Sequence, residues 1–282
     1  MATAHIKITP TGASLGAFIT GVDLSKPLSE AEVAAIRKAW LDHLVLAFPN
    51  QPMNHGDLER FTGYFGPFGD DPFIAPIDGH PHIIEVKRAA NEKASVFAAA
   101  WHSDWSFQDT PPAGTILHSK ITPPVGGDTL FCNGYAAYEA LSDEMKARIE
   151  GLNAVHSAAL AYAPDGVYGE NDGKDRSMTI KASEDALNTK SHPIVRVHPE
   201  TGRKALFINP GYVKTVEGLS DEEAFFLLVE LYGVAHDERF VYRHKWQDDM
   251  LLMWDNRCTQ HMATGGYDGH ARLLHRTTVA GP

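Results

Sequence analysis

Short hydrophobic and alternating stretches recur along the whole chain. Residues 5–9 and 16–22 alternate between apolar and polar positions, as β-strands with one buried face do. An apolar run at 45–48, ended by Pro49, predicts a third strand. The chain is therefore expected to be rich in β structure. The same criteria predict further strands near 82–87, 113–119, 128–132, 152–157, 193–197, 205–209, 239–244, 250–254 and 272–279.

Helical spacing is confined to a few stretches. Ser29 stands three residues before Glu32 and forms a capping box, a motif that opens helices. Ser220 and Glu223 repeat this motif. Because helices and strands do not alternate regularly, the pattern is not that of a doubly wound α/β fold. The expected helices start at Ser29, near Asn54, near Tyr135 and at Ser220, and the last three stop at Gly66-Pro67, before Gly151 and at Gly233.

The pattern favours one mainly β domain over residues 1–282, a β-sandwich or jelly roll with added helices, in the α+β class. We see no repeat, linker or change of composition that would divide it. Residues 162–179 are polar and contain several glycines, and this stretch is too long for a routine connection. We therefore expect a mobile loop or a lid there.

Composition and net charge limit the classes of binding partner that the protein is expected to have. Hydrophobic residues make up 43% of the chain and charged residues 22%, as in water-soluble globular proteins. The net charge of −11 argues against nucleic acid or an anionic membrane surface as a partner. No apolar leader and no membrane-length apolar run is present. Two isolated cysteines, Cys132 and Cys258, form no disulfide pattern, so a cytoplasmic location is expected.

Candidate chemistry begins at residues 101–107 (WHSDWSF). If this stretch is a strand, His102 and Asp104 lie on one face, with Cα atoms roughly 6–7 Å apart, close enough to share a metal ion. Trp101, Trp105 and Phe107 would flank the pair and exclude water. Taken alone, the tripeptide is more typical of a buried histidine hydrogen-bonded to an aspartate for structural reasons.

A second histidine changes that balance. His261 ends the stretch WDNRCTQH, which follows the apolar strand expected at 250–254. With His102 and Asp104 it has the composition of a facial triad of two histidines and one carboxylate, which binds Fe(II) and leaves positions open. Zinc is an alternative metal, because catalytic zinc sites also keep an open position.

Four motifs in order resemble one known family. They are His102-Ser103-Asp104, Gly126-Gly127-Asp128-Thr129, the stretch WDNRCTQH and residues 272–278 (RLLHRTT). Together they resemble the TauD/TfdA family of Fe(II)/2-oxoglutarate-dependent dioxygenases, over about residues 16–281. The resemblance implies a double-stranded β-helix, a form of jelly roll, and the cosubstrates 2-oxoglutarate and O₂.

The resemblance also implies roles for individual residues. His102, Asp104 and His261 would bind iron, while Thr129 and Arg272 would hold the distal carboxylate of 2-oxoglutarate. Without the preceding Gly-Gly-Asp, Thr129 is more typical of an ordinary strand threonine, and the alternative for Arg272 is a solvated charge at the end of a strand. However, Arg272 and Arg276 fall on one face of the last strand, which suggests that each meets an anion. In the family pattern Arg276 contacts the acidic group of the substrate.

The expected substrate is set by departures from the taurine-oxidising members. Those members use a histidine, a tyrosine and an asparagine where this chain has Asp71, Ile74 and Ala98. Residues 65–67 (FGP), 77–79 (IDG) and 88–92 (RAANE) resemble the aryloxyalkanoate branch more closely, and Phe73, Ile74 and residues 96–100 would give a roomier, more apolar wall. We therefore expect a small anionic substrate with an apolar body, bound by Arg276, Asp71, Ile74 and Ala98.

Other functions remain open at this point. Taurine, an alkyl sulfonate or an alkyl sulfate is the alternative substrate within the same family. A zinc-dependent hydrolase and a non-catalytic small-molecule-binding jelly roll are alternatives of a different class. We also expect a homo-oligomer, whose size the sequence does not specify.

Overall fold

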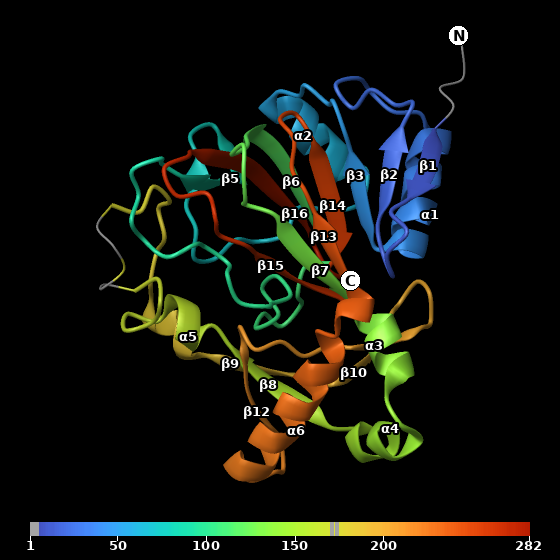
Figure 1. Cartoon of the computed structure of the whole chain (residues 1–282), viewed down its shortest axis with the longest axis vertical. Coiled ribbons are helices and arrows are strands. Elements are labelled where there is room, and N and C mark those ends of the chain that lie inside the picture. Colours follow the sequence, from blue (N-terminus) through green and yellow to red (C-terminus); the bar gives the residue numbers. More distant parts are fainter. Residues whose placement is uncertain (1–5, 170–171, 173–174) are drawn as a thin grey trace.

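The large sheet of the molecule has eight strands (Figure 1). The computed structural model describes residues 6–169, 172 and 175–282. Neighbouring strands of this sheet run antiparallel, except that β2 and β3 are parallel. Side by side, the strands are β1 (Lys7–Pro10), β2 (Ala17–Thr20), β3 (Val45–Phe48), β14 (Leu251–Asp255), β6 (Gly114–Ile121), β16 (Arg272–Val279), β5 (His80–Arg88) and β4 (Pro76–Ile77).

A smaller sheet packs against the large one. It consists of β13 (Val241–His244), β7 (Thr129–Asn133) and β15 (Thr259–Ala263), with β7 in the middle. Phe131 of β7 joins Trp254 and Leu274 of the large sheet in one buried apolar cluster. This pair of sheets is the double-stranded β-helix, or jelly roll, that the sequence predicts.

Two helices pack on the large sheet through a second apolar cluster. They are α1 (Glu30–His43) and α2 (His55–Gly63). Both begin at capping boxes, with Ser29 and Asn54 as the N-cap residues, and the sequence predicts both starts. Their buried side chains, including Trp40 and Phe61, share one core cluster with residues of β3, β6 and β14.

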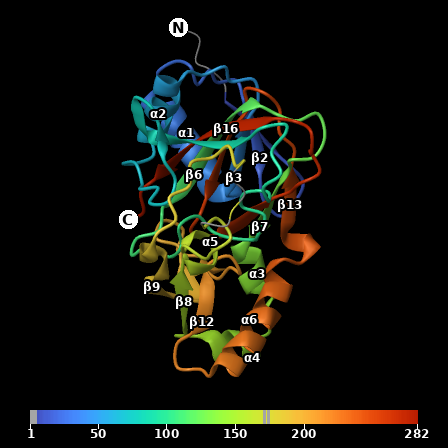
Figure 2. The ribbon, with the colours of Figure 1, turned by 90° about the vertical axis from the view of Figure 1, so that its left-hand side faces the viewer.

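The segment between β7 and β13 forms the lower part of the molecule in Figures 1 and 2. Its apolar residues make a core of their own between α6 and the nearby strands. Its elements are α3 (Gly134–Ala140), α4 (Asp143–Ile149), β8 (Asn153–Ser157), α5 (Ala159–Tyr162), β9 (Thr189–Pro193), β10 (Val195–Val197), β11 (Lys204–Leu206), β12 (Val213–Val216) and α6 (Asp221–Ala235), with 3₁₀ turns at Glu184–Leu187 and Glu238–Phe240.

Four local predictions are wrong. Helix α2 ends at Gly63, before the expected stop at Gly66-Pro67. The helix expected over 135–149 is two helices, because Leu141 is extended and Ser142 caps a new start by accepting a 3.1 Å hydrogen bond from Met145. Helix α6 continues past Gly233 to Ala235. Residues 101–107 are not a strand, since His102 makes only a single bridge, to His261, and a turn follows in which Trp105 has a φ of 47°. Among the described residues, no helix is both long and apolar enough to cross a membrane.

Candidate active site

The structure brings His102, Asp104 and His261 together. The two histidines bond to each other through their backbones, with N–O distances of 2.9 and 2.7 Å. Asp104 Oδ1 lies 3.6 Å from His102 Nε2 and 3.9 Å from His261 Nε2. All three residues are buried, and their ligand atoms lie within 4.8 Å of one another. A turn, and not the expected strand, therefore brings the side chains of His102 and Asp104 close enough to share a metal ion.

The donor atoms of this cluster suit a cation. His102 Nδ1 donates to the carbonyl of Ala100 at 2.8 Å, which directs Nε2 toward Asp104 Oδ1. Burial, reinforced by His102, lowers the pKa of His261 to about 3, so the His261 ring is neutral near pH 7. Burial alone would raise the pKa of Asp104, but His261 and Arg276 outweigh it and hold that pKa well below its usual range. A carboxylate with two imidazoles is a typical ligand set for Fe(II).

A hydrogen-bond chain fixes the orientation of Asp104. The hydroxyl of Thr115 donates to Asp104 Oδ2 at 2.6 Å and accepts from Asn256 Nδ2 at 2.8 Å. Asn256 Oδ1 in turn accepts from Trp254 Nε1 at 2.9 Å. Oδ1 of Asp104 thus remains directed at the two histidines. No short motif marks Thr115, because its partner Asn256 lies 141 positions away along the chain.

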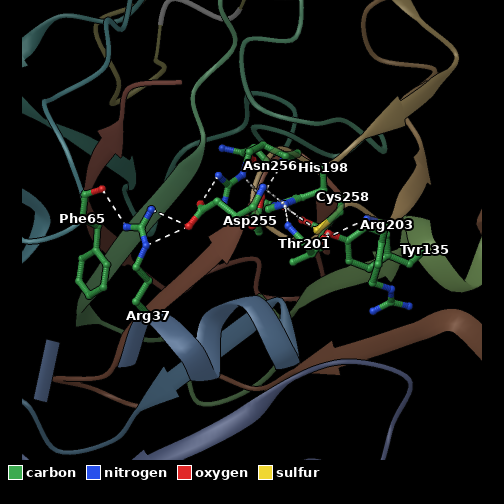
Figure 3. Close-up of polar contacts among 12 residues, drawn as sticks. Arg37, Phe65, Tyr135, His198, Thr201, Arg203, Asp255, Asn256 and Cys258 are labelled. Carbon is green, nitrogen blue, oxygen red and sulfur yellow. Dashed lines mark hydrogen bonds and ion pairs between the residues drawn. The ribbon is translucent and has the colours of Figure 1, made fainter. Parts of the chain in front are cut away.

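A second buried cluster, His198 with Asp255 and Cys258, has the composition of a metal site but is a structural network (Figure 3). His198 Nδ1 accepts from the backbones of Glu200 and Thr201, and Nε2 donates to Asp255 at 3.0 Å. Both nitrogens of His198 are therefore used. The network anchors the turn that leads into β15 and His261.

Arg257 completes that network. It donates to both oxygens of Asp255, at 2.8 and 2.6 Å, and to Glu200 at 2.7 Å. Glu200 also pairs with Arg37 of α1 at 2.7 Å. The carboxylate of Asp255 is thus saturated by hydrogen bonds, and Arg257 and Arg37 balance Glu200, so the cluster has no need of a cation.

Thr129 and Arg272, the residues expected to hold 2-oxoglutarate, meet at Trp246. Trp246 Nε1 donates to Thr129 Oγ1 at 3.0 Å, and the Arg272 guanidinium lies 5.8 Å from the centre of the Trp246 ring. Arg272 is buried, its Nε has no hydrogen-bond partner, and burial lowers its pKa. It makes no ion pair with any described residue. A buried guanidinium without a carboxylate is prepared to bind an anion.

Gly126 and Gly127 bring the start of β7 close to Arg272. Both have positive φ angles, 68° and 69°. A Cβ on Gly126 would lie 2.4 Å from the carbonyl oxygen of Gly266, and one on Gly127 would lie 3.5 Å from Arg272 Cδ. Position 126 requires a positive φ angle and leaves no room for a Cβ, and only glycine meets both requirements.

An apolar cavity of about 450 Å³ opens beside His102 and Asp104. Ala98 and Arg276, two of the expected substrate residues, line it. Asp71 and Ile74 are not among its lining residues, and Ile74 packs instead in a buried cluster with Phe73. The wall consists of Ser95, Val96, Phe97, Ala98, Ala99, Ala100, Leu160, Ala161, Tyr162, Val167, Tyr168, Pro210, Gly211 and Tyr212, with His102, Asp104, Trp105 and Arg276 at the polar side.

The segment expected to be a lid supplies one side of this cavity. Tyr168 accepts a 2.9 Å hydrogen bond from the backbone of Ala98, which also lines the cavity. Ser177 donates through its backbone to Glu92 at 2.9 Å, and Arg176 donates to the carbonyl of Ser95 at 3.0 Å. Residues 170–171 and 173–174 of the expected lid lie outside the described residues. The described part is joined to residues 89–98.

Arg276 is held on several sides. One of its terminal nitrogens pairs with Asp71, and the other lies 3.4 Å from Asp104 Oδ1. Its guanidinium carbon lies 4.8 Å from the centre of the Trp105 ring, and Trp105 Nε1 donates to the same oxygen of Asp71 at 2.8 Å. Despite burial, Asp71 and Asp104 raise the pKa of Arg276, which remains charged.

A jelly roll that holds two histidines and a carboxylate beside an apolar cavity defines a candidate mononuclear non-haem iron enzyme. The sequence profile described as "Taurine catabolism dioxygenase TauD, TfdA family" matches residues 5–278. The chain therefore belongs to the TauD/TfdA family, as the motifs predicted. It is an enzyme, a dioxygenase that uses Fe(II), 2-oxoglutarate and O₂. Family membership favours this class over the hydrolase and the non-catalytic binding module.

Individual relatives cover nearly the whole chain. An alpha-ketoglutarate-dependent sulfate ester dioxygenase of Pseudomonas putida is 31% identical, over 98% of this chain and 90% of its own. An alpha-ketoglutarate-dependent 2,4-dichlorophenoxyacetate dioxygenase of Cupriavidus pinatubonensis is 34% identical, over 93% of each. The crystal structure of a taurine dioxygenase from Burkholderia xenovorans superimposes with a TM-score of 0.82 at 33% identity, covering 98% of this chain and 90% of that one.

Proposed function

We propose that this dioxygenase hydroxylates an apolar molecule that carries one acidic group, an aryloxyalkanoate-like acid, at a carbon next to oxygen. The apolar cavity beside His102 and Asp104, with Arg276 at its polar side, is the observation that carries this proposal. An aryl body gains about 25 cal/mol per Å² when such walls cover it. Taurine has little apolar surface, and its ammonium group would find no carboxylate in this wall other than Asp104. The activity of the relative from Cupriavidus pinatubonensis supports the same substrate class.

In this proposal His102, Asp104 and His261 hold Fe(II), and Thr129 and Arg272 hold the distal carboxylate of 2-oxoglutarate. The buried and unpaired Arg272 supports its assignment, because a bound carboxylate would satisfy its charge. When bound, Fe(II) and 2-oxoglutarate supply an oxidation that inserts one oxygen atom of O₂ into the substrate and the other into succinate, with release of CO₂.

The side chains of the cavity position the substrate and exclude water. Phe97, Tyr162 and Tyr212 enclose an apolar body next to His102, which keeps the reacting carbon out of solvent. Burial raises the pKa of Tyr212, so its hydroxyl stays protonated and is able to donate a hydrogen bond. No side chain has to act as a general acid or base. If the hydroxylated carbon bears oxygen, the product collapses to a carbonyl compound and a released alcohol.

An alkyl sulfate, a sulfonate or taurine is the second candidate substrate. The relative from Pseudomonas putida acts on sulfate esters and covers the chain equally well. A sulfate ester combines an apolar chain with one acidic group, so the same cavity suits it. Both candidates place the acidic group near Arg276.

Substrate-dependent succinate formation tests the proposal. We expect aryloxyalkanoates to be turned over faster than alkyl sulfates, alkyl sulfonates and taurine by the Fe(II)-loaded enzyme. Zinc in place of iron should give no succinate, and omission of 2-oxoglutarate should abolish product. A clear preference for taurine over every apolar acid would overturn the proposal.

The expected homo-oligomer and the cytoplasmic location also belong to this proposal. Static light scattering of the purified enzyme measures the first, and cell fractionation the second. A monomer at micromolar concentration would contradict the expected assembly.

A further inference from the structure

The two buried arginines of β16 differ in their partners. Arg272 has no ion pair among the described residues, whereas Arg276 pairs with Asp71. The side chain of Asp71 is 9% exposed and that of Arg276 is 5% exposed, so solvent screens this pair little. Arg272 is therefore free to bind an anionic ligand, whereas Arg276 already pairs with the carboxylate of Asp71.

Asp71 approaches Arg276 from outside the cavity. Arg276 lines the apolar cavity, whereas Asp71 lines a separate hollow with Gly69, Pro72 and Ile74. Trp105 fixes this arrangement, because its Nε1 donates to Asp71 while its ring lies against Arg276. A ligand in the cavity thus meets the guanidinium and not the carboxylate behind it.

The partner of Arg276 in the loaded enzyme follows from the proposed metal site. Asp104 Oδ1 faces both histidines, so a bound cation would take up that oxygen. Asp71 would then be the carboxylate that balances Arg276. An anionic group in the cavity would have to share Arg276 with Asp71 and would be repelled by it.

We propose that Asp71 is a specificity-determining residue that neutralises Arg276 and weakens selection for a charged head group. This inference rests on the proposed function. It means that the site selects a substrate by its apolar body and one hydrogen-bond acceptor, and that a substrate with a neutral acceptor binds nearly as well as an acid. The active site therefore takes apolar acids together with their uncharged analogues, such as amides and esters. Small, strongly hydrated anions are poor ligands.

Matched ligand pairs test this inference. The wild-type protein and two variants are loaded with Mn(II) and N-oxalylglycine, which bind without turnover. Calorimetry then compares phenoxyacetate with phenoxyacetamide, and hexyl sulfate with the neutral hexyl sulfamate. Asp71→Asn removes the charge but keeps an acceptor for Trp105 Nε1. Asp70→Asn is the control, because it removes the same charge from an exposed neighbour.

The expected result is a change in the ratio of acid affinity to neutral affinity. The wild-type protein and Asp70→Asn should bind both members of a pair within about tenfold of each other. Asp71→Asn should bind the acids about tenfold more tightly with little change for the neutral ligands, on the scale of one charged interaction. Asp71→Ser is a second charge-removing variant, and thermal unfolding shows that each variant is folded.

An unchanged ratio in Asp71→Asn, or weaker acid binding, would overturn the inference and leave the proposed function intact. If the wild-type protein binds none of the four ligands but Asp71→Asn binds the acids, the proposed substrate class fails and so does the acceptance of neutral analogues, whereas the neutralisation of Arg276 by Asp71 is supported. If Asp71→Asn binds no acid either, both are overturned.

Discussion

The hydroxyl of Thr115 donates a 2.6 Å hydrogen bond to Oδ2 of Asp104, the oxygen that faces away from His102 and His261. This bond decides which oxygen the carboxylate presents to a metal. Residues that orient metal ligands typically contribute 10- to 100-fold to metal affinity, by an order-of-magnitude rule.

Replacing Thr115 by valine should therefore weaken Fe(II) binding roughly tenfold while the fold persists. The methyl group fills the space of the hydroxyl, but Asn256 loses its acceptor and Asp104 its donor. A metal titration measures the change. Thr115→Ser keeps the hydroxyl and should behave like the wild type. Equal affinity in the valine variant would show that Thr115 has no positioning role.

Alanine at Asp104 should abolish succinate formation and remove specific Fe(II) binding. It deletes the only carboxylate of the proposed triad and leaves two imidazoles. Equilibrium dialysis measures iron, and succinate formation measures activity. Wild-type turnover in Asp104→Ala would remove the basis for assigning the iron site to these residues.

Arg272→Ala should raise the apparent 2-oxoglutarate constant by about ten- to a hundredfold, the scale of one charge-assisted hydrogen bond. The apparent constant for the primary substrate should change little, because Arg276 lines that cavity and Arg272 does not. Initial rates at varied 2-oxoglutarate separate the two. Arg239→Ala, at an exposed arginine, is the control. An unchanged constant in Arg272→Ala would place the cosubstrate elsewhere.

Two buried histidines should make the protein sensitive to mild acid. Burial, as the main cause, lowers the pKa of His156 and of His244 to about 3 each, from an ordinary value of 6.5. Between about pH 6.5 and pH 3, these two histidines are protonated in the unfolded chain but remain neutral in the folded chain. Stability is therefore lost as pH falls through this window, by about 1.4 kcal/mol per pH unit for each histidine.

Urea denaturation at pH 7 and pH 5 measures this loss. In His156→Gln the difference between the two pH values should shrink by about 2 kcal/mol. The comparison is made within each variant, so any general cost of the substitution cancels. His270→Gln, at an exposed position, should leave the difference as it is in the wild type. The same result in both variants would mean that His156 is not the cause.

Residues 162–179 are predicted to become protected when ligands bind. Tyr162, Val167 and Tyr168 of this segment line the cavity, so a bound substrate would add contacts to it. Limited proteolysis with and without 2-oxoglutarate and substrate follows the rate of cleavage. Equal cleavage in both conditions would make the segment a fixed structural insertion.

The parts of the fold that follow from local sequence were predictable. Ser29 and Ser220 cap helices through residues only three positions away, so their side chains suffice to mark the starts. The stretch around His102 was misjudged as a strand because its turn depends on a bridge to His261, far along the chain. The prediction of one helix over 135–149 was wrong because Ser142 caps the start of a second helix inside an otherwise helical pattern.

Residues of the candidate site that lie in short motifs were likewise predictable, whereas contacts between distant residues were not. His102, Asp104 and His261 were found because each lies in a recognisable motif, and the structure brings them together. The pairing of Asp71 with Arg276 joins residues 205 positions apart, and no short pattern reports it. Asp71 was placed near the substrate, but its role as the partner of Arg276 is visible only in three dimensions.

The hydrogen bonds between residues 89–98 and the segment 162–179 have a consequence for engineering. Tyr168 to Ala98, Ser177 to Glu92 and Arg176 to Ser95 make the two stretches one unit that bears much of the apolar wall. His261 and Arg272 belong to strands outside this unit. A designer who wishes to alter substrate range should therefore transplant both stretches together from one relative, since a chimera that takes only one would lose these bonds.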